Sequence, residues 1–187
     1  MEMPISALRA DLGSLTDEPE LVERAKYDRA LFAVLYRRHY PAIAGYLFRR
    51  TGDAHATEDL VADVFLIALR KLPRYRHRGV PLRAWLFRIA TNETNRWARR
   101  RRKTASINES LATSAGDCTP DQGIELSRTQ EALLLLPPKQ QAVIALHYLE
   151  GMPIEEVAEV VGCRVGTVKS RLSRARDALR VKLTNRR

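Results

Sequence analysis

The sequence predicts an all-α protein, made of two small helical domains joined by a flexible linker. Apolar residues recur at spacings of three and four over most of the 187-residue chain, which is the period of an amphipathic helix. No strictly alternating apolar and polar run, typical of a strand, interrupts them. Residues 104–128 are rich in Ser, Thr, Gly, Asp and Pro and have no apolar period, which indicates a linker. We therefore expect an acidic N-terminal extension at 1–24, a first domain at 25–103 and a second domain at 129–187.

The first domain is expected to be built from helices in succession. Residues 30–51 carry apolar side chains at helical spacing, and Pro41 predicts a break between two segments. Residues 52–72 continue the pattern, with Thr57 as a candidate N-cap. A basic loop and one long helix ending in arginines follow. Trp85, near the start of that helix, is expected to pack in the core.

The first domain also carries two candidate surfaces of opposite charge. Glu58, Asp59 and Asp63 form an acidic patch, which is either solvated or docks a basic protein partner. The loop at 74–80 interleaves basic residues with an aromatic, a pattern that suits single-stranded nucleic acid. Along the helix at 82–103, amides can read a base edge and arginines can neutralise phosphates. The candidate nucleic-acid contacts are Arg74, Tyr75, Arg76, His77, Arg78, Asn92, Asn95, Arg96, Arg99 and Arg100.

The second domain has the pattern of a helix-turn-helix. Pro153 starts a short helix at 154–161, and we expect Gly162 to end it in the left-handed conformation of a C-cap. A tight turn and a basic helix from Gly166 follow. In this motif the second helix enters the major groove, with its N-terminal residues at base edges. A solvated amphipathic helix is the alternative, which the preceding helix and turn disfavour. The candidate contacts are Thr167, Lys169, Ser170, Arg171, Ser173, Arg174 and Arg176.

Composition narrows the class of protein further. A formal net charge of +10 favours a polyanionic partner, nucleic acid first and a membrane surface second. Cys118 and Cys163 form no CxxC pair, and the histidines lack metal-ligand spacing. No paired carboxylates, nucleophile–base arrangement or Gly-rich phosphate loop is recognisable. We expect no cofactor, no metal and no enzymatic activity. Since no secretory signal or long apolar run is recognisable, we also expect a cytoplasmic protein without membrane insertion.

These motifs, in this order, resemble the extracytoplasmic-function group of bacterial sigma factors. The stretches that carry the resemblance are EDLVADVFLIALRKL, PLRAWLFRIATNE and LPPKQQAVIALHYLEGMPIEEVAEVVGCRVGTVKSRLSRARDALR, and it runs from about residue 28 to residue 183. It implies sigma region 2 in the first domain and sigma region 4 in the second. It also implies a protein that binds core RNA polymerase, directs it to specific promoters and helps to open the −10 region.

The resemblance assigns a role to each candidate surface. The loop at 74–81, with Asn92, would hold an extruded base of the −10 element, and the basic helix of the second domain would read the −35 element. Arg96 and Ser173 depart from the residues common at their positions, which affects the promoter sequence rather than the function. The implied partners are core RNA polymerase, through its β′ clamp helices and β flap, promoter DNA and an anti-sigma factor, with a monomer when free. The implied clamp contacts are Glu58, Asp59, Leu60, Asp63 and Val64.

Two other classes of protein remain open at this point. A transcription factor that binds duplex DNA alone predicts tight binding without polymerase, usually as a dimer on paired half-sites. A basic adaptor for RNA or an anionic membrane is the third class, and it leaves the helix-turn-helix unexplained.

Overall fold

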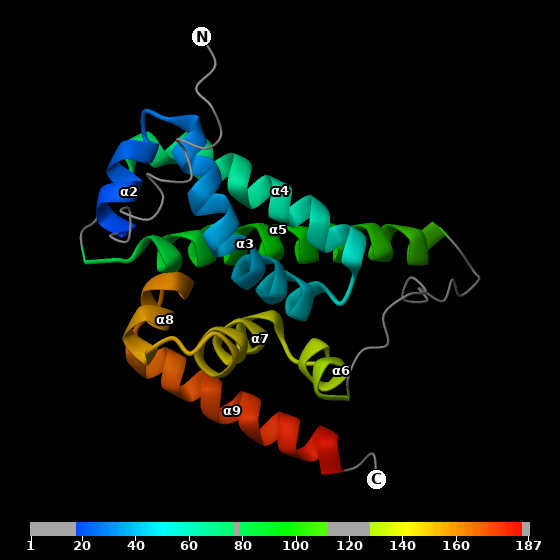
Figure 1. Ribbon diagram of the computed structural model, residues 1–187. Coiled ribbons are helices and arrows are strands. Elements are labelled where there is room, and N and C mark those ends of the chain that lie inside the picture. The colour runs from blue at the N-terminus through cyan, green and yellow to red at the C-terminus, as the bar shows by residue number, and fades with distance from the viewer. Residues whose placement is uncertain (1–17, 77–78, 112–127, 185–187) are drawn as a thin grey trace.

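Every regular element that the computed structural model describes, at residues 18–76, 79–111 and 128–184, is helical, which confirms the predicted fold class. Figure 1 shows two groups of helices, α2 to α5 in the upper part of the view and α6 to α9 in the lower part. The elements are α2 (Glu18–Ala25), α3 (Arg29–Thr51), α4 (Ala54–Lys71), the short turn η1 (Leu72–Arg74), α5 (Leu82–Leu111), α6 (Arg128–Leu134), α7 (Pro138–Ile144), the π-helical turn η2 (Ala145–Leu149), α8 (Ile154–Val161) and α9 (Val165–Thr184).

Two details of the first domain differ from the sequence prediction. Helix α3 runs through Pro41 without a break. The apolar residues on both sides of it, Leu35 and Ile43, are buried, and this packing offsets the one backbone hydrogen bond that the proline removes. The N-cap of α4 is Asp53, whose carboxylate accepts from the amide of Ala56 at 2.9 Å. Thr57 is instead buried and donates its hydroxyl to the Asp53 carbonyl at 2.6 Å.

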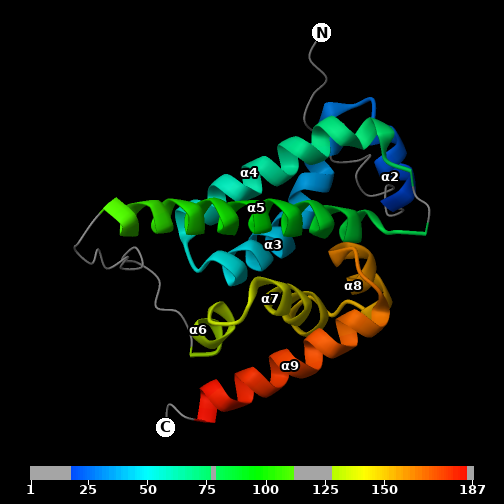
Figure 2. The same cartoon turned by 180° about the vertical axis from the view of Figure 1, so that it is seen from behind.

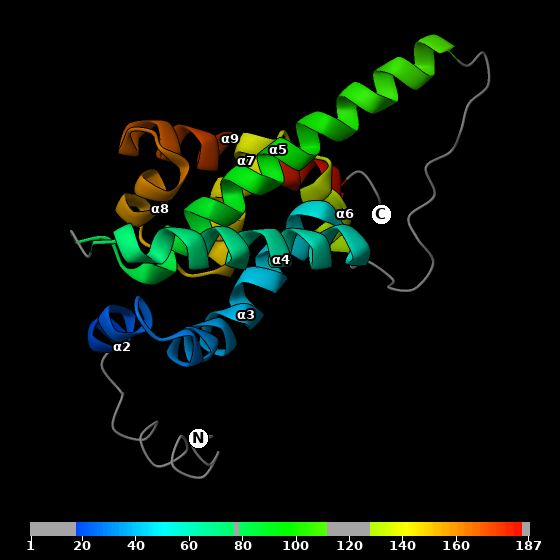
Figure 3. The same ribbon diagram turned by 90° about the horizontal axis from the view of Figure 1, so that it is seen from above.

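Helix α5 extends beyond the predicted end of the first domain. It continues past residue 103 to Leu111, into the stretch expected to be linker. Figure 3 shows its last turns projecting beyond the other helices. The rest of the predicted linker, residues 112–127, lies outside the described residues.

The second domain contains the predicted helix-turn-helix. Gly162 has φ 64° and ends α8 with its amide bonded to the carbonyl of Ala158, as expected for a left-handed C-cap. Val157 of α8 and Val168 of α9 are fully buried, and Leu172 is 5% exposed, so the apolar faces of the two helices lie against each other and against α7. This packing orients α9 and leaves its basic side chains on the outside.

The two domains are in direct contact. Helix α5 packs on α8, and α3 packs on α6 and α7; Figure 2 shows α8 beside the first turns of α5. Glu150, which follows η2, has a side chain only 6% exposed and forms ion pairs with Arg49 of α3 and Arg83 of α5. The Nη2 atom of Arg83 also donates to the Glu150 carbonyl at 2.6 Å. We call these contacts of Arg49, Arg83 and Glu150 the seam.

Candidate nucleic-acid interface

Helix α9 presents the predicted duplex-reading residues on its outer side. The side chains of Lys169, Ser173, Arg174 and Arg176 are exposed, whereas those of Thr167, Ser170 and Arg171 are half-buried near the start of the helix. The Ser170 hydroxyl donates to the Thr167 carbonyl at 3.0 Å, and Arg171 Nη1 lies 3.5 Å from the Cys163 sulfur in the turn. The exposed residues form a basic surface that can reach phosphates and base edges in a major groove.

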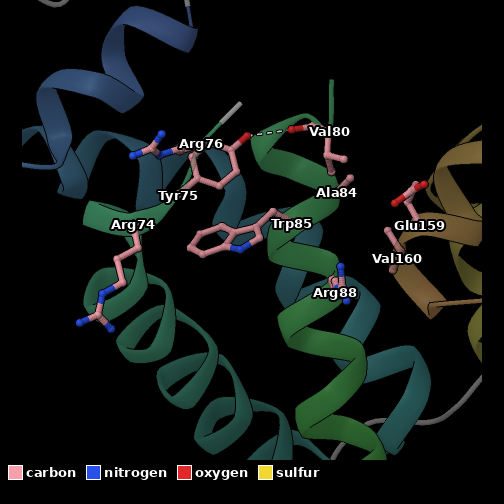
Figure 4. A pocket seen from close by; sticks show the side chains of 9 residues that line it. All are labelled: Arg74, Tyr75, Arg76, Val80, Ala84, Trp85, Arg88, Glu159 and Val160. Carbon is pink, nitrogen blue, oxygen red and sulfur yellow. Dashed lines mark hydrogen bonds between the residues drawn. The ribbon is translucent and has the colours of Figure 1, made fainter. Parts of the chain in front are cut away.

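The basic loop, the start of α5 and α8 line a pocket of about 450 Å³. Its aromatic wall is Trp85, which is half-buried rather than packed fully into the core. Figure 4 shows the indole between the loop and Arg88, with α8 on the far side of α5. The lining residues are Arg74, Tyr75, Arg76, Val80, Ala84, Trp85, Arg88, Glu159 and Val160. A half-buried indole beside Arg88, with Arg74 and Arg76 on the neighbouring loop, suits an unstacked base and its phosphates.

Tyr75, a predicted strand contact, lines the pocket but is largely buried. Its residue is only 7% exposed, its ring contacts Trp85 with centroids 5.0 Å apart, and its hydroxyl donates to the Val80 carbonyl at 2.8 Å. Burial raises the pKa of Tyr75 above 10.0, and Glu18 and Glu23 of α2 add to the shift. In this position the ring braces the loop and Trp85, and the exposed Arg74 and Arg76 remain the loop residues able to meet a strand; His77 and Arg78 lie outside the described residues.

The remaining −10 candidates extend along α5 from the pocket. Asn92 is exposed one turn beyond Arg88, and Arg96, Arg99 and Arg100 are exposed further along. Arg96 Nη1 contacts the buried Glu93 carboxylate at 3.1 Å. Asn95 is half-buried, and its side-chain oxygen accepts from Arg50 Nη2 at 3.1 Å.

Arg50 lies at the contact between the two domains, a position that the sequence pattern does not reveal. It is 4% exposed, and its guanidinium donates to three neutral groups: the Tyr46 hydroxyl at 2.7 Å, Asn95, and Gln141 of the second domain at 3.3 Å. Trp85 and Arg88 also line the pocket, although the sequence pattern did not predict either residue as a nucleic-acid contact. These two share a helical face with Asn92 at spacings of three and four, so the helical periodicity contained a signal that could have found them.

The acidic patch of α4 is partly as expected. Glu58, Asp59 and Asp63 are exposed, which leaves them available to a protein partner. Leu60 is 2% exposed and Val64 is fully buried, so both belong to the core between α3, α4 and α5. Their assignment as surface contacts is therefore wrong: the helical period turns these two positions inward while it turns the carboxylates outward.

A second pocket, of about 440 Å³, lies between α6 and the end of α9. Leu135, Val181 and Leu183 are each about half exposed around it, at 54%, 57% and 44%. Arg128 and Lys182 also contribute to the lining. The apolar side chains make this pocket a candidate docking place for a protein helix.

Neither a metal site nor a membrane-spanning helix occurs at residues 18–76, 79–111 and 128–184. No group of three His, Cys, Asp or Glu residues there has the arrangement of a metal site. No helix in the same part of the chain combines the length and apolar character needed to cross a bilayer.

Comparisons with known proteins agree on one family. The family model for sigma-70 region 2 matches residues 35–104, and that for sigma-70 region 4 matches residues 126–179. The chain is 36% identical over 163 residues to the RNA polymerase sigma factor YlaC of Bacillus subtilis, covering 82% of this chain and 92% of that one. It is 30% identical over 172 residues to the extracytoplasmic-function RNA polymerase sigma factor SigW of the same organism, covering 84% and 91%.

Solved structures give the same result. The sigma factor RpoE of Bartonella quintana, in complex with the anti-sigma factor NepR, has a TM-score of 0.68 and 30% identity, covering 83% of this chain and 98% of that chain. CnrH, in complex with the cytosolic domain of CnrY, has a TM-score of 0.68 and 28% identity, covering 88% and 96%.

Proposed function

Because the chain belongs to the sigma-70 family, among the factors of the extracytoplasmic-function type, we propose that its two domains divide promoter recognition between a −35 duplex and a −10 strand. The function of the chain is promoter-directed initiation of transcription. The finer proposal assigns the −35 duplex to α9 and an extruded −10 base to the pocket beside Trp85. The observation that carries it is the pairing of a basic recognition helix in one domain with an aromatic, arginine-lined pocket in the other.

The proposed mechanism needs no catalytic step from this chain. Extruding a base from a duplex costs a few kcal/mol, and contacts made only with the extruded base can offset that cost. Trp85 would supply a stacking surface, Arg74, Arg76 and Arg88 would neutralise phosphates, and the exposed amide of Asn92 would read the base edge. Since the two domains are covalently joined, binding at one element raises the effective concentration of the other domain at its own element.

Core RNA polymerase is the proposed protein partner, at two surfaces. The exposed carboxylates of Glu58, Asp59 and Asp63 support docking of the β′ clamp helices, through charge. The apolar pocket between α6 and α9 supports docking of the β flap. An anti-sigma factor is a further proposed partner, because the similar sigma factor RpoE was solved in complex with the anti-sigma factor NepR.

Run-off transcription from genomic DNA fragments tests the proposal. Purified bacterial core polymerase is assayed with and without this protein. New, discrete start sites that need both components are expected, and their alignment would give the promoter elements. Tight duplex binding by the protein alone, with no new starts, would instead indicate a stand-alone regulator.

Charge reversal tests the clamp surface separately. The double substitution Glu58→Lys and Asp59→Lys should abolish the new starts and leave binding of the free protein to DNA unchanged, because both side chains are exposed on α4, away from α9 and from the pocket. Unchanged transcription by this variant would refute the docking assignment.

A further inference from the structure

A further cavity lies between the end of α3, the middle of α5 and the helices α6 and α7, which Figure 1 shows beneath the end of α3. Its volume is about 520 Å³, within the range of roughly 300–1,000 Å³ that is typical of small-molecule sites. The seam joins the domains near the start of α5, and this cavity begins about three turns further along that helix. The lining residues are Arg50, Thr51, Thr94, Trp97, Ala98, Arg101, Arg102, Leu134, Leu136, Pro138 and Gln141.

The cavity contains a buried cation that has no counter-ion. Arg50 is 4% exposed, and three of its N–H groups donate to the neutral acceptors Tyr46, Asn95 and Gln141. A guanidinium has further N–H groups, and the described residues supply no acceptor for them and no carboxylate. Because a charge removed from water is stabilised mainly by an opposite charge, this guanidinium favours an anion in the cavity.

Two more cations border the cavity from α5. Arg101 and Arg102 are both exposed, and the guanidinium carbon of Arg101 lies 5.4 Å from the ring centroid of Trp97. Unlike the two pockets described above, which include Glu159 and Glu131, this cavity has no acidic residue among its described lining. Guanidinium groups match the oxygens of a phosphate in bidentate geometry, so three of them around one space favour a multiply charged phosphate ligand.

Much of the remaining lining is apolar. Trp97 comes from the first domain, and Leu134, Leu136 and Pro138 come from the second. Trp97, Leu134 and Pro138 are half-buried, so part of each side chain remains open to a ligand. Inorganic phosphate would leave this apolar surface uncovered, whereas the planar base of a nucleotide would cover it.

We propose that this cavity is a binding site for a small nucleotide that carries at least two phosphates. The base would lie against Trp97 and Leu134, and the phosphates would lie among the three guanidinium groups. The site is separate from the pocket beside Trp85, with which it shares no lining residue. It needs both domains, because the first supplies the cations and the second supplies most of the apolar wall. A nucleotide bound there would stabilise the contact between the domains by mass action.

Isothermal titration calorimetry on the full-length protein gives the first readout. The probes are the diphosphates of adenosine, guanosine, cytidine and uridine, each nucleoside without phosphate, and inorganic pyrophosphate. At least one diphosphate should bind, and pyrophosphate and the matching nucleoside should each bind at least about tenfold more weakly, because each lacks one half of the contacts.

A charge-matched pair of variants separates this site from general attraction to a basic protein. The double substitution Arg101→Gln and Arg102→Gln should weaken binding of the diphosphate by at least about tenfold. The control is Arg70→Gln with Lys71→Gln, which removes the same charge from exposed positions at the end of α4 that do not line the cavity. This control should change the affinity by less than about twofold, because exposed charges at a distance are screened by salt.

Two further measurements locate the ligand. Leu134→Ala removes part of the apolar wall, so it should weaken binding of the diphosphate several-fold and leave the affinity for pyrophosphate unchanged. The sequence contains two tryptophans, so Trp85→Phe leaves Trp97 as the only indole. In that background the diphosphate should quench the fluorescence of Trp97, and pyrophosphate should not.

The absence of binding by all four diphosphates, or equal weakening by the two double variants, would overturn the inference. Pyrophosphate that binds as tightly as the best diphosphate would exclude a nucleotide site. Displacement of the diphosphate by a short single strand of DNA would assign the cavity to nucleic acid and would also overturn it. Far-UV circular dichroism shows whether each variant is folded, and the arginine pair decides the question if Leu134→Ala does not fold. No measurement here contains polymerase or promoter DNA, so failure of the proposed function would not alter these results.

Discussion

The buried cation Arg50 makes one substitution unusually informative, Tyr46→Phe. The Tyr46 residue is fully buried, and its hydroxyl accepts from Arg50 Nη1 at 2.7 Å. Because arginine only donates, the phenol must accept this bond, and its own hydrogen is then free for the Thr91 hydroxyl at 2.8 Å. The substitution keeps the ring and its edge contact with Phe87, and removes both hydrogen bonds at once.

The magnitude follows from the two bonds. A hydrogen bond to a charged group contributes about 1.5–3 kcal/mol and a neutral one about 0.5–1.5 kcal/mol. Arg50 retains Asn95 and Gln141, but at 3.1 and 3.3 Å these acceptors do not replace the shorter bond. We therefore expect Tyr46→Phe to lower the free energy of unfolding of the first domain by about 2–4.5 kcal/mol.

Urea unfolding followed by tryptophan fluorescence is the assay, since both tryptophans belong to the first domain. Tyr40→Phe is the matched control: this residue is 40% exposed and loses only a solvated hydroxyl, so it should change stability by less than about 0.5 kcal/mol. If Tyr46→Phe also stays within about 0.5 kcal/mol of the parent, Arg50 does not depend on this phenol and the reasoning is refuted.

Three further outcomes can be measured on the free protein. Lys169→Ala, at an exposed position of α9, should weaken duplex binding and reduce the slope of log affinity against log salt by about one. Anisotropy titrations at several salt concentrations measure this slope, and an unchanged slope would exclude a phosphate contact. Leu172→Ala, at a position 5% exposed, should destabilise the second domain by about 2–4 kcal/mol in urea unfolding followed by circular dichroism, and a smaller loss would mean that α9 closes the cavity. The raised pKa of Tyr75, caused first by burial and then by Glu18 and Glu23, means that above pH 10.0 the unfolded phenol ionises first. Stability should therefore fall as pH rises beyond that value, and Tyr75→Phe should flatten this part of the profile; parallel profiles would contradict the shift.

The sequence predicts the helices and the exposed surfaces well, because both depend on local periodicity. The three-and-four spacing places Val168 and Leu172 inside and Lys169 and Arg174 outside, and the structure agrees. A left-handed glycine after a short helix is similarly local, so Gly162 is predicted with its conformation.

What the sequence does not predict depends on contacts between distant segments. The sequence predicts an exposed stacking role for Tyr75. In the structure the ring contacts Trp85 and is buried, a contact between separate segments that the local pattern does not encode. In the sequence nothing distinguishes Arg50 from the other arginines. Its three neutral acceptors come from α3, α5 and α7, which meet only in the folded chain. The contact of Glu150 with Arg49 and Arg83 joins residues 101 and 67 positions apart, a pairing that no local pattern encodes.

The extension of α5 past the first domain has a consequence for tethering. A helix advances roughly 1.5 Å and turns about 100° per residue, so the point where the connecting chain leaves this helix has a defined direction as well as a distance. One residue inserted between 103 and 111 would swing that exit point to another side of the helix. Under the proposed division of promoter recognition between the two domains, the phase of α5 is part of the geometry that sets which promoter spacings they span together.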